Sequence, residues 1–409
     1  MSITAPAGFR AGAATAGLKP SGKPDVALVV NDGPRFDAAA VFTSNRCKAN
    51  PVLWSEQVME DGALRAVVLN SGGANCYTGP EGFQATHASA ERVAELIGAG
   101  AIDVAVCSTG LIGEQLDRAK LLAGIGAAAA GLSSDGGAAA AEAILTTDTR
   151  PKQATAGTDT TRHSDTTPGM HAWSNVATPA ERDQSTWVVG GMAKGAGMLA
   201  PALATMLVVL TTDAVADAAT LDRALRAATA TTFDRLDTDG CMSTNDTVIL
   251  MSSGASGVTP SESELAEAVT AVCDDLARQL WADAEGAHHE IAIDVVNAAS
   301  VADAIEAGRA VARSNLFKCA IAGNDPNWGR VLAAIGTTDA EFDPATVDVA
   351  MNDVWVCRTG GVGEPRGKVD LSGRDVTVTI DLHAGTETAT IRTTDLTTDY
   401  VHENSAYST

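Results

Sequence analysis

The chain has 409 residues, and 45% of them are hydrophobic, which is enough to bury two or three core regions. Its 28 Lys and Arg residues stand against 51 Asp and Glu residues, giving a formal net charge of -23 at pH 7. This charge repels polyanions at long range, so we expect neither nucleic acid nor an anionic membrane as a partner.

The seven cysteines are scattered along the chain and form no Cys-x-x-Cys pair. That pattern predicts reduced, buried thiols and argues against a disulfide framework or a zinc site. Residues 1–12 lack a basic end followed by an apolar block, and no apolar run approaches the length of a membrane span. We therefore expect a cytoplasmic protein without a bound metal.

The first third of the chain alternates strand-like and helix-like segments, which predicts a mixed α/β layer architecture. Strands are expected at 26–30, 38–43, 64–69 and 103–107, with a helix after Pro80. Two small polar turns, 70–75 and 108–113, follow two of these strands. Such turns expose backbone N–H groups that can hold anions or oxyanions, although plain loop chemistry explains either turn taken alone.

Two contrasting segments occupy the middle of the chain. Residues 114–145 are rich in alanine and are predicted to be helical. From 151 to 185 the composition shifts to Thr, Ser, Asp, Pro and Gly with little apolar periodicity, which predicts an exposed, mobile loop. His163 and His171 lie in this loop without a metal-ligand partner at useful spacing, so we expect both to be solvated.

A glycine-rich turn that begins at Lys194 leads to Thr205, which opens the apolar run 206–210. The run predicts a buried strand with Thr205 at its start. That position suits a nucleophile. However, β-branched threonine is common at strand starts, so the local pattern alone favours an ordinary strand residue.

The second half continues the mixture of helices and strands. We expect helices at 217–236, after a Ser261–Glu264 capping box and at 302–317, with strands at 248–251, 290–296, 376–382 and 388–391. Asp237 and Asp239 have no further acidic partner at loop-ligand spacing, so we expect a hydrogen-bonded turn that braces the site. Glu285 follows a long helix, where position alone favours a surface carboxylate over a ligand for a cationic group.

Six separated motifs, in this order along nearly the whole chain, resemble the ornithine acetyltransferase family of arginine biosynthesis. They are Cys-Ser-Thr-Gly (107–110), Thr-Thr-Asp (146–148), Lys-Gly-Ala-Gly-Met (194–198) with Ala-Thr-Met-Leu-Val (204–208), Ser-Thr-Asn-Asp-Thr (243–247), Asp-Pro-Asn-Trp-Gly-Arg (325–330) and Glu-Asn-Ser-Ala-Tyr (403–407). An ordered set of this size is far more specific than any one motif.

The resemblance implies a precursor that cuts itself between Ala204 and Thr205, leaving an alpha chain of residues 1–204 and a beta chain of residues 205–409. Thr205 would then be the N-terminal nucleophile, and Thr109 and Gly110 would stabilise the oxyanion. The resemblance also implies substrate contacts at Thr146, Lys194, Thr205, Glu285, Asn404 and Thr409. The implied assembly is a heterotetramer of two alpha and two beta chains.

The implied fold is an α/β (α+β) layered sandwich of the ornithine acetyltransferase and β-aminopeptidase type, with a smaller C-terminal α/β region. The implied reaction moves an acetyl group from N2-acetyl-L-ornithine to L-glutamate through an acetyl-threonine intermediate. No cofactor is expected, and acetyl-CoA is a possible co-substrate. The α-amino group released by the cut, with a reference pKa of about 7.7–8.0, can serve as the base for the threonine hydroxyl.

The chain departs from the family pattern in two places. His288-His289 stands where the family usually carries Thr-Lys, and the loop at 151–185 is longer than the usual connector. If the family lysine holds a substrate carboxylate, the histidine pair makes substrate binding here weaker or pH-dependent. The simpler interpretation is that the two histidines only lead into a strand. Two other functions stay open: an aminopeptidase or amidohydrolase of the same fold, and an uncut scaffold without activity.

Overall fold

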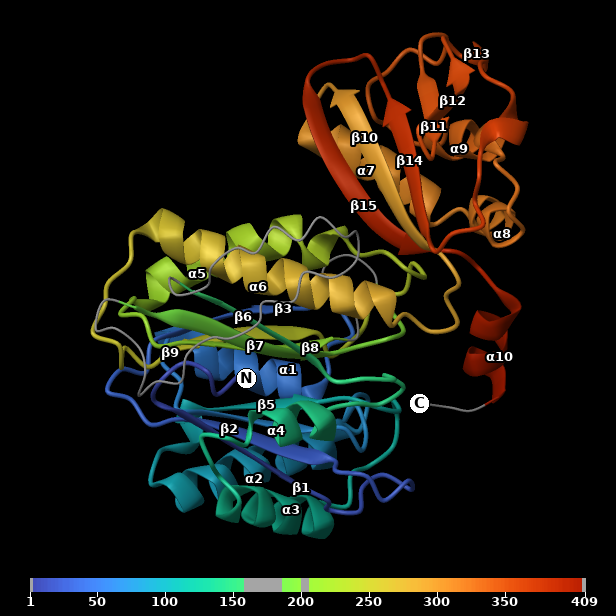
Figure 1. Cartoon of the computed structure of the whole chain (residues 1–409). Coiled ribbons are helices and arrows are strands. Elements are labelled where there is room, and N and C mark those ends of the chain that lie inside the picture. Colours follow the sequence, from blue (N-terminus) through green and yellow to red (C-terminus); the bar gives the residue numbers. More distant parts are fainter. Residues whose placement is uncertain (1–2, 158–185, 200–205, 407–409) are drawn as a thin grey trace.

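The computed structural model describes residues 3–157, 186–199 and 206–406. Two sheets stack on each other with helices on both outer sides, and a third sheet lies in a separate C-terminal part (Figure 1). We call the first two sheets with their helices the two-sheet body, and β10–β15 with α7–α9 the C-terminal part. The predicted layered α/β architecture with a smaller C-terminal region is confirmed.

The first sheet has four strands in the order β1-β2-β4-β5, of which only β4 and β5 run parallel. Its strands are β1 (Phe9–Ala14), β2 (Val26–Asn31), β4 (Ala66–Asn70) and β5 (Val104–Ser108). The helices around it are α1 (Asn50–Val58), α2 (Gly79–Ile97), α3 (Arg118–Ala130) and α4 (Gly137–Ala143). Three predicted strands and the helix after Pro80 are thereby confirmed, and the alanine-rich segment contains two helices.

The second sheet has five strands in the order β3-β9-β8-β7-β6. Its strands are β3 (Ala38–Phe42), β6 (Lys152–Gly157), β7 (Val188–Lys194), β8 (Leu207–Thr212) and β9 (Thr247–Ser252), covered by α5 (Ala218–Thr231) and α6 (Glu262–Ala282). The first four residues of central strand β8 are all apolar, because both faces of the strand are buried. Leu207 and Val209 pack in the core between the sheets, whereas Val208 and Leu210 pack beneath the helices.

The prediction of an exposed loop from residue 151 is wrong for its first part, because Lys152–Gly157 forms strand β6. This strand pairs along its whole length with β7. Lys152 is fully buried because Asp148 and Asp283 each accept a hydrogen bond from its ammonium at 2.6 Å. A tertiary ion pair therefore overrides a composition typical of loops. Residues 158–185, with His163 and His171, lie outside the described residues.

The C-terminal part contains a six-stranded sheet in the order β13-β12-β11-β14-β10-β15. Its elements are β10 (Glu290–Ala298), α7 (Val301–Ala312), α8 (Asn315–Ala322), α9 (Trp328–Ile335), β11 (Asp348–Met351), β12 (Val354–Arg358), β13 (Gly361–Val362), β14 (Asp375–Asp381) and β15 (Glu387–Thr394). The single helix expected at 302–317 is wrong, because Ser314 accepts a hydrogen bond from the Phe317 N–H and starts a second helix.

The last helix, α10 (Thr398–Ala406), leaves the C-terminal part and returns beside the two-sheet body (Figure 1). Its start is tied to the segment before β10, since the Thr397 hydroxyl donates to the Gly286 carbonyl at 2.5 Å. Asp399 and Asn404 of α10 also contact His288 and Glu285, so this helix is held at two further points. Single 3₁₀ turns lie at Met59–Asp61, Ala101–Asp103, Phe233–Arg235 and Arg366–Lys368.

The cysteines are free thiols, as predicted, but their predicted burial holds for only some of them. Cys76, Cys107, Cys273 and Cys357 are buried, whereas Cys47, Cys241 and Cys319 are exposed. The three exposed residues lie in loops or on the outer side of a helix rather than in core strands. Within the three described ranges, no helix combines the length and apolarity needed to cross a membrane.

Candidate active site

Lys194 connects the two sheets of the body at one end of their strands. It is the last residue of β7 and is 1% exposed. Its ammonium donates a hydrogen bond to Thr109 Oγ1 at 3.1 Å, and Thr109 directly follows β5 of the other sheet. Two residues predicted as substrate-binding and oxyanion-stabilising, 85 positions apart, therefore lie in direct contact.

Only glycine fits at position 110, where the two polar turns meet. It has a φ of 125°, and a Cβ added to it would lie 2.9 Å from the Cα and N atoms of Gly73 in the other turn. The Ala74 N–H also donates to the Leu111 carbonyl at 3.0 Å. Both turns singled out in the sequence therefore form one compact structure.

The donors available at this structure can be assigned individually. The Thr109 N–H already donates to the Asn70 carbonyl at 3.0 Å, so its backbone is occupied. Its hydroxyl oxygen accepts from Lys194, which leaves the hydroxyl proton able to donate. The Gly110 N–H has no hydrogen-bond partner within the described parts of the chain. A hydroxyl and an adjacent N–H thus form a pair of donors suited to an oxyanion.

Asn245 holds this pair of turns against the second sheet. Its side-chain amide donates to the Ala74 carbonyl at 2.6 Å and to the Ser108 carbonyl at 2.8 Å. Asn245 is buried and lies just before β9. Asp239 accepts hydrogen bonds from the N–H groups of Met198 and Cys241, which confirms the predicted bracing turn.

Asp148 anchors the turn that follows Lys194. Its Oδ1 accepts hydrogen bonds from the Gly195 N–H and from the Lys152 ammonium, both at 2.6 Å. Its Oδ2 accepts the Thr146 N–H at 3.1 Å, which places the predicted substrate residue Thr146 beside the same turn. Asp148 was part of a recognised motif, but its role depends on partners distant in sequence.

Burial and charge act together on the ionisable groups of the site. Burial lowers the pKa of Lys194, and Asp148 and Glu285 partly oppose this effect. Burial also favours a raised pKa for Asp148, but Lys194 and Lys152 outweigh it and hold that pKa below its usual value. The site therefore keeps a buried carboxylate ionised between two buried ammonium groups.

Lys19 is a further cation at this site that the sequence did not reveal. Its ammonium donates to the Leu145 carbonyl at 2.7 Å, next to Thr146, and to the Pro24 carbonyl at 2.9 Å. Burial lowers its pKa to about 8, and Lys194 contributes to the shift. No motif contains Lys19, and only the fold of the segment before β2 places it here.

Glu285 and Asn404 meet on the other side of the Lys194 turn. The Asn404 amide donates to Glu285 Oε2 at 3.1 Å, and the Glu285 N–H donates to the Ala196 carbonyl at 3.0 Å. A Cβ on Gly197 would lie 2.5 Å from Glu285 Oε2, so a larger residue at this position would displace the carboxylate. Glu285 is half-buried, and it contacts Asn404 and the turn that follows Lys194.

The histidine pair leads directly into strand β10, as the simpler interpretation predicted. His289 is buried, and its ring contacts Asp395 Oδ2 at 2.6 Å. His288 is exposed and contacts Asp399 of α10 at 2.8 Å. Both histidines therefore help to hold the segment that carries Asn404.

The structure brings together the predicted site residues that it describes. These are Thr109, Gly110, Thr146, Lys194, Glu285 and Asn404. Ala204, Thr205 and Thr409 lie outside the described residues. Asp148, Lys152 and Lys19 are charged residues that the structure adds to the site. In the described ranges, no group of three His, Cys, Asp or Glu side chains is arranged to hold a metal ion.

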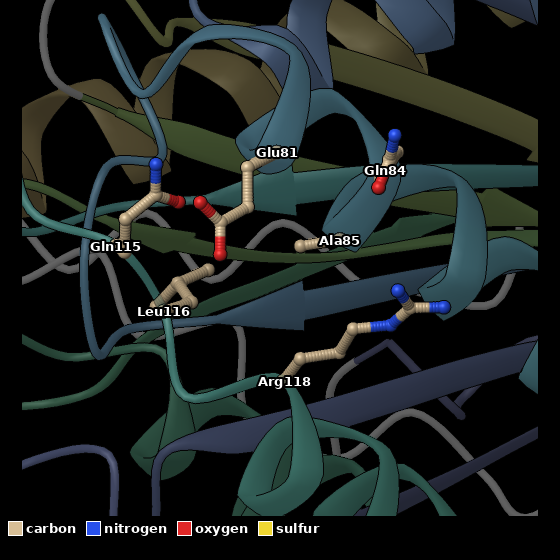
Figure 2. Close-up of a pocket in the computed structure, with 6 residues that line it drawn as sticks. All are labelled: Glu81, Gln84, Ala85, Gln115, Leu116 and Arg118. Carbon is tan, nitrogen blue, oxygen red and sulfur yellow. The ribbon is translucent and has the colours of Figure 1, made fainter.

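A separate cavity of about 360 Å³ lies between α2 and the segment before α3. Figure 2 shows its lining residues, which are Glu81, Gln84, Ala85, Gln115, Leu116 and Arg118. None of them is a predicted site residue. The cavity is therefore separate from the predicted site residues that the structure describes.

Comparisons with known proteins agree with the motif order. The model of the ArgJ family matches residues 10–409. The chain is 62% identical over 408 residues to the arginine biosynthesis bifunctional protein ArgJ of Streptomyces avermitilis, covering 100% of both chains. It is 61% identical to the protein of that name from Streptomyces coelicolor, again covering 100% of both. A crystal structure of ornithine acetyltransferase complexed with ornithine, from Mycobacterium tuberculosis, shares 48% identity over 49% of this chain and 94% of that chain, with a TM-score of 0.40.

Proposed function

Because this chain belongs to the ArgJ family, we propose that it transfers the acetyl group of N2-acetyl-L-ornithine to L-glutamate in arginine biosynthesis. The observation that carries the proposal is the contact between Lys194 and Thr109. It joins a buried cation to an oxyanion-type donor pair at the end of β7. The next strand, β8, begins two residues after Thr205 and pairs Leu207 with Lys194.

Thr205 is the proposed nucleophile, released by cleavage of the bond to Ala204. Its α-amino group takes the hydroxyl proton as Oγ attacks the acetyl carbonyl carbon. The Thr109 hydroxyl and the Gly110 N–H stabilise the oxyanion that forms. The carbon–nitrogen bond to ornithine then breaks, the proton passes to the departing nitrogen, and an acetyl-threonine ester remains. The glutamate nitrogen attacks the ester carbonyl carbon, the bond from that carbon to Thr205 Oγ breaks, and a proton from the amine returns to Oγ as N-acetylglutamate leaves.

Charge complementarity supports the choice of substrates. Both substrates carry an α-carboxylate, and Lys194 is the buried cation that matches it. N-acetylornithine also carries a side-chain ammonium, and the half-buried Glu285 carboxylate is its proposed partner. Thr146, Asn404 and Thr409 complete the proposed substrate contacts.

The proposal extends to the assembly and the second donor. Two alpha and two beta chains form the proposed heterotetramer, the protein works in the cytoplasm without a cofactor, and acetyl-CoA serves as an alternative acetyl donor. The assembly, the location and the second donor each have a direct measurement: mass in solution, cell fractionation, and formation of N-acetylglutamate from acetyl-CoA plus glutamate.

The reaction class is tested by whether glutamate is needed. Purified protein is incubated with N-acetylornithine, with and without glutamate, and ornithine, acetate and N-acetylglutamate are measured. We expect ornithine release in turnover amounts only with glutamate, matched by N-acetylglutamate. Equal ornithine release without glutamate, accompanied by acetate, would instead show the hydrolase alternative.

A further inference from the structure

Asp246 is a buried carboxylate that the mechanism above does not use. It is 0% exposed and directly precedes strand β9. Its Oδ1 accepts a hydrogen bond from the Met206 N–H at 3.0 Å. Its Oδ2 makes no hydrogen bond to any residue in the described ranges. The Ser243 hydroxyl lies near enough to lower the Asp246 pKa, yet it does not reach hydrogen-bond geometry.

Burying a carboxylate with an unsatisfied oxygen costs free energy, because that oxygen loses its hydration and gains no hydrogen bond in return. Burial raises the pKa of Asp246 well above its usual range, and Lys194 opposes this effect only in part. Asp213, at the other end of β8, provides a contrast. It is also buried, but each of its oxygens accepts a backbone N–H, from Ala7 at 2.9 Å and from Val188 at 2.8 Å.

The contact with Met206 fixes more than one residue. The peptide group between Thr205 and Met206 is planar, so holding the Met206 N–H sets the plane of the peptide that leaves Thr205. The Met206 carbonyl is held as well, because it accepts the Thr247 N–H at 3.2 Å. Met206 is therefore fixed on both sides by the residues that open β9.

The loop that ends at Asp246 also holds the chain upstream of residue 200. Asp239 Oδ2 accepts the Met198 N–H at 2.7 Å, and the Thr238 N–H donates to the Leu199 carbonyl at 2.6 Å. One loop, residues 237–246, thus contacts the last described residues before position 200 and the first described residue after position 205.

We propose that Asp246 is a positioning residue for self-cleavage, acting through the Met206 amide; this inference rests on the proposed cleavage before Thr205. In that step Thr205 Oγ attacks the Ala204 carbonyl carbon, and the bond from that carbon to the Thr205 nitrogen breaks. The hydroxyl proton ends on that nitrogen. Water then hydrolyses the ester, leaving a carboxyl group on Ala204 and a free Thr205 hydroxyl. The angle of attack depends on the backbone orientation that Asp246 fixes.

The test compares self-cleavage of three variants of the full chain with wild type. Precursor is followed by denaturing electrophoresis after synthesis in a cell-free system, with folding checked by circular dichroism. We expect Asp246→Ala to slow cleavage on the order of 100-fold, as a misplacement near 1 Å does. Asp246→Asn keeps the acceptor for the Met206 N–H, so its rate should return to within about tenfold of wild type with an unchanged pH profile.

Asp213→Ala is the matched control, since it removes a buried carboxylate from the opposite end of β8. Its folded fraction should cleave at the wild-type rate.

Cleavage of Asp246→Ala at the wild-type rate would overturn the inference. So would an Asp246→Asn cleavage rate as low as that of a folded Asp246→Ala. If Asp246→Ala does not fold, the Asp246→Asn variant alone decides the test. A cleavage rate more than tenfold below that of wild type would then overturn the positioning role. The same holds if its cleavage rate loses the pH dependence that wild type shows. A wild-type chain that never cleaves would instead overturn the proposed function.

Discussion

The two-sheet body has a buried cluster of charged side chains in addition to its surface ion pairs, whereas each ion pair within the C-terminal part keeps one partner at least 42% exposed. Lys152 and Lys194 lie fully inside the body beside Asp148. In the C-terminal part, the pair of Lys368 and Glu364 is 60% and 45% exposed. The buried lysine of that part, Lys318, donates to the Thr238 carbonyl of the body.

This difference separates two uses of charge. A surface pair contributes little to stability because water screens both groups. A buried charge is costly and persists only where partners satisfy it, so a cluster of such charges in one place marks a site. In this protein the cluster surrounds the end of β7 and the turn that follows Lys194.

The largest predicted effect contrasts one lysine from each region. Lys152→Met leaves Asp148 and Asp283 without their shared cation, and breaking a buried pair of this kind costs about 3–5 kcal/mol. Lys368→Met breaks only the surface pair and should cost less than about 1 kcal/mol. Urea unfolding of both variants measures the difference. Equal losses would show that burial does not set the value of these pairs.

A second contrast concerns hydroxyl groups. Thr109→Val removes the proposed oxyanion donor, and kcat should fall on the order of 100-fold to 1000-fold. Thr338→Val removes a hydroxyl in the C-terminal part that donates only to the Ile335 carbonyl, at 2.7 Å, and kcat should not change. Steady-state assays of the cleaved enzymes test both. A Thr109→Val enzyme with normal kcat would remove Thr109 from the mechanism.

A third, smaller effect should separate the two substrates. Glu285→Gln removes the charge proposed to pair with the ornithine ammonium, and KM for N-acetylornithine should rise about tenfold. Glutamate has no such ammonium, so its KM should change less. The proposed pairing fails if both KM values rise equally.

The smallest effect is a pH dependence that originates at Lys19. Burial lowers its folded pKa from 10.5 to about 8, so the unfolded chain binds more protons between these two values. The free energy of unfolding should therefore rise as pH increases from 8 to 10 through this group. Lys19→Gln should show a smaller rise than wild type in urea unfolding. Parallel pH curves would contradict the assigned shift.

Local pattern predicted the strands and helices well where a continuous apolar run or a helical apolar stripe marks burial, as in β8 and α6 respectively. It failed where a distant partner decides the structure. Lys152 enters a strand because Asp283, 131 residues away, pairs with it, and Gly110 is constrained by Gly73 of another turn. The composition and residue spacing of a single sequence do not show which of these distant residues become neighbours in the fold.

The candidate site was predicted in the same uneven way. Thr109 and Lys194 lie in the ordered motifs, and Glu285 was implied by the family resemblance; the structure brings the three residues to one turn. The sequence could not predict that Lys19 joins the site, nor what the Asp148 and Asp246 oxygens contact. The ionisation of a buried carboxylate depends on the groups that surround it in the fold. Those groups come from both sheets and become neighbours only on folding.

The measurement that tests the central claim most directly is denaturing electrophoresis of purified, active wild type beside Thr205→Ala, with N-terminal sequencing of the fragments. Wild type should give two fragments, residues 1–204 and 205–409, with the second beginning at Thr205. Thr205→Ala should stay a single inactive chain. A fully active wild type that remains one chain of 409 residues would contradict the account.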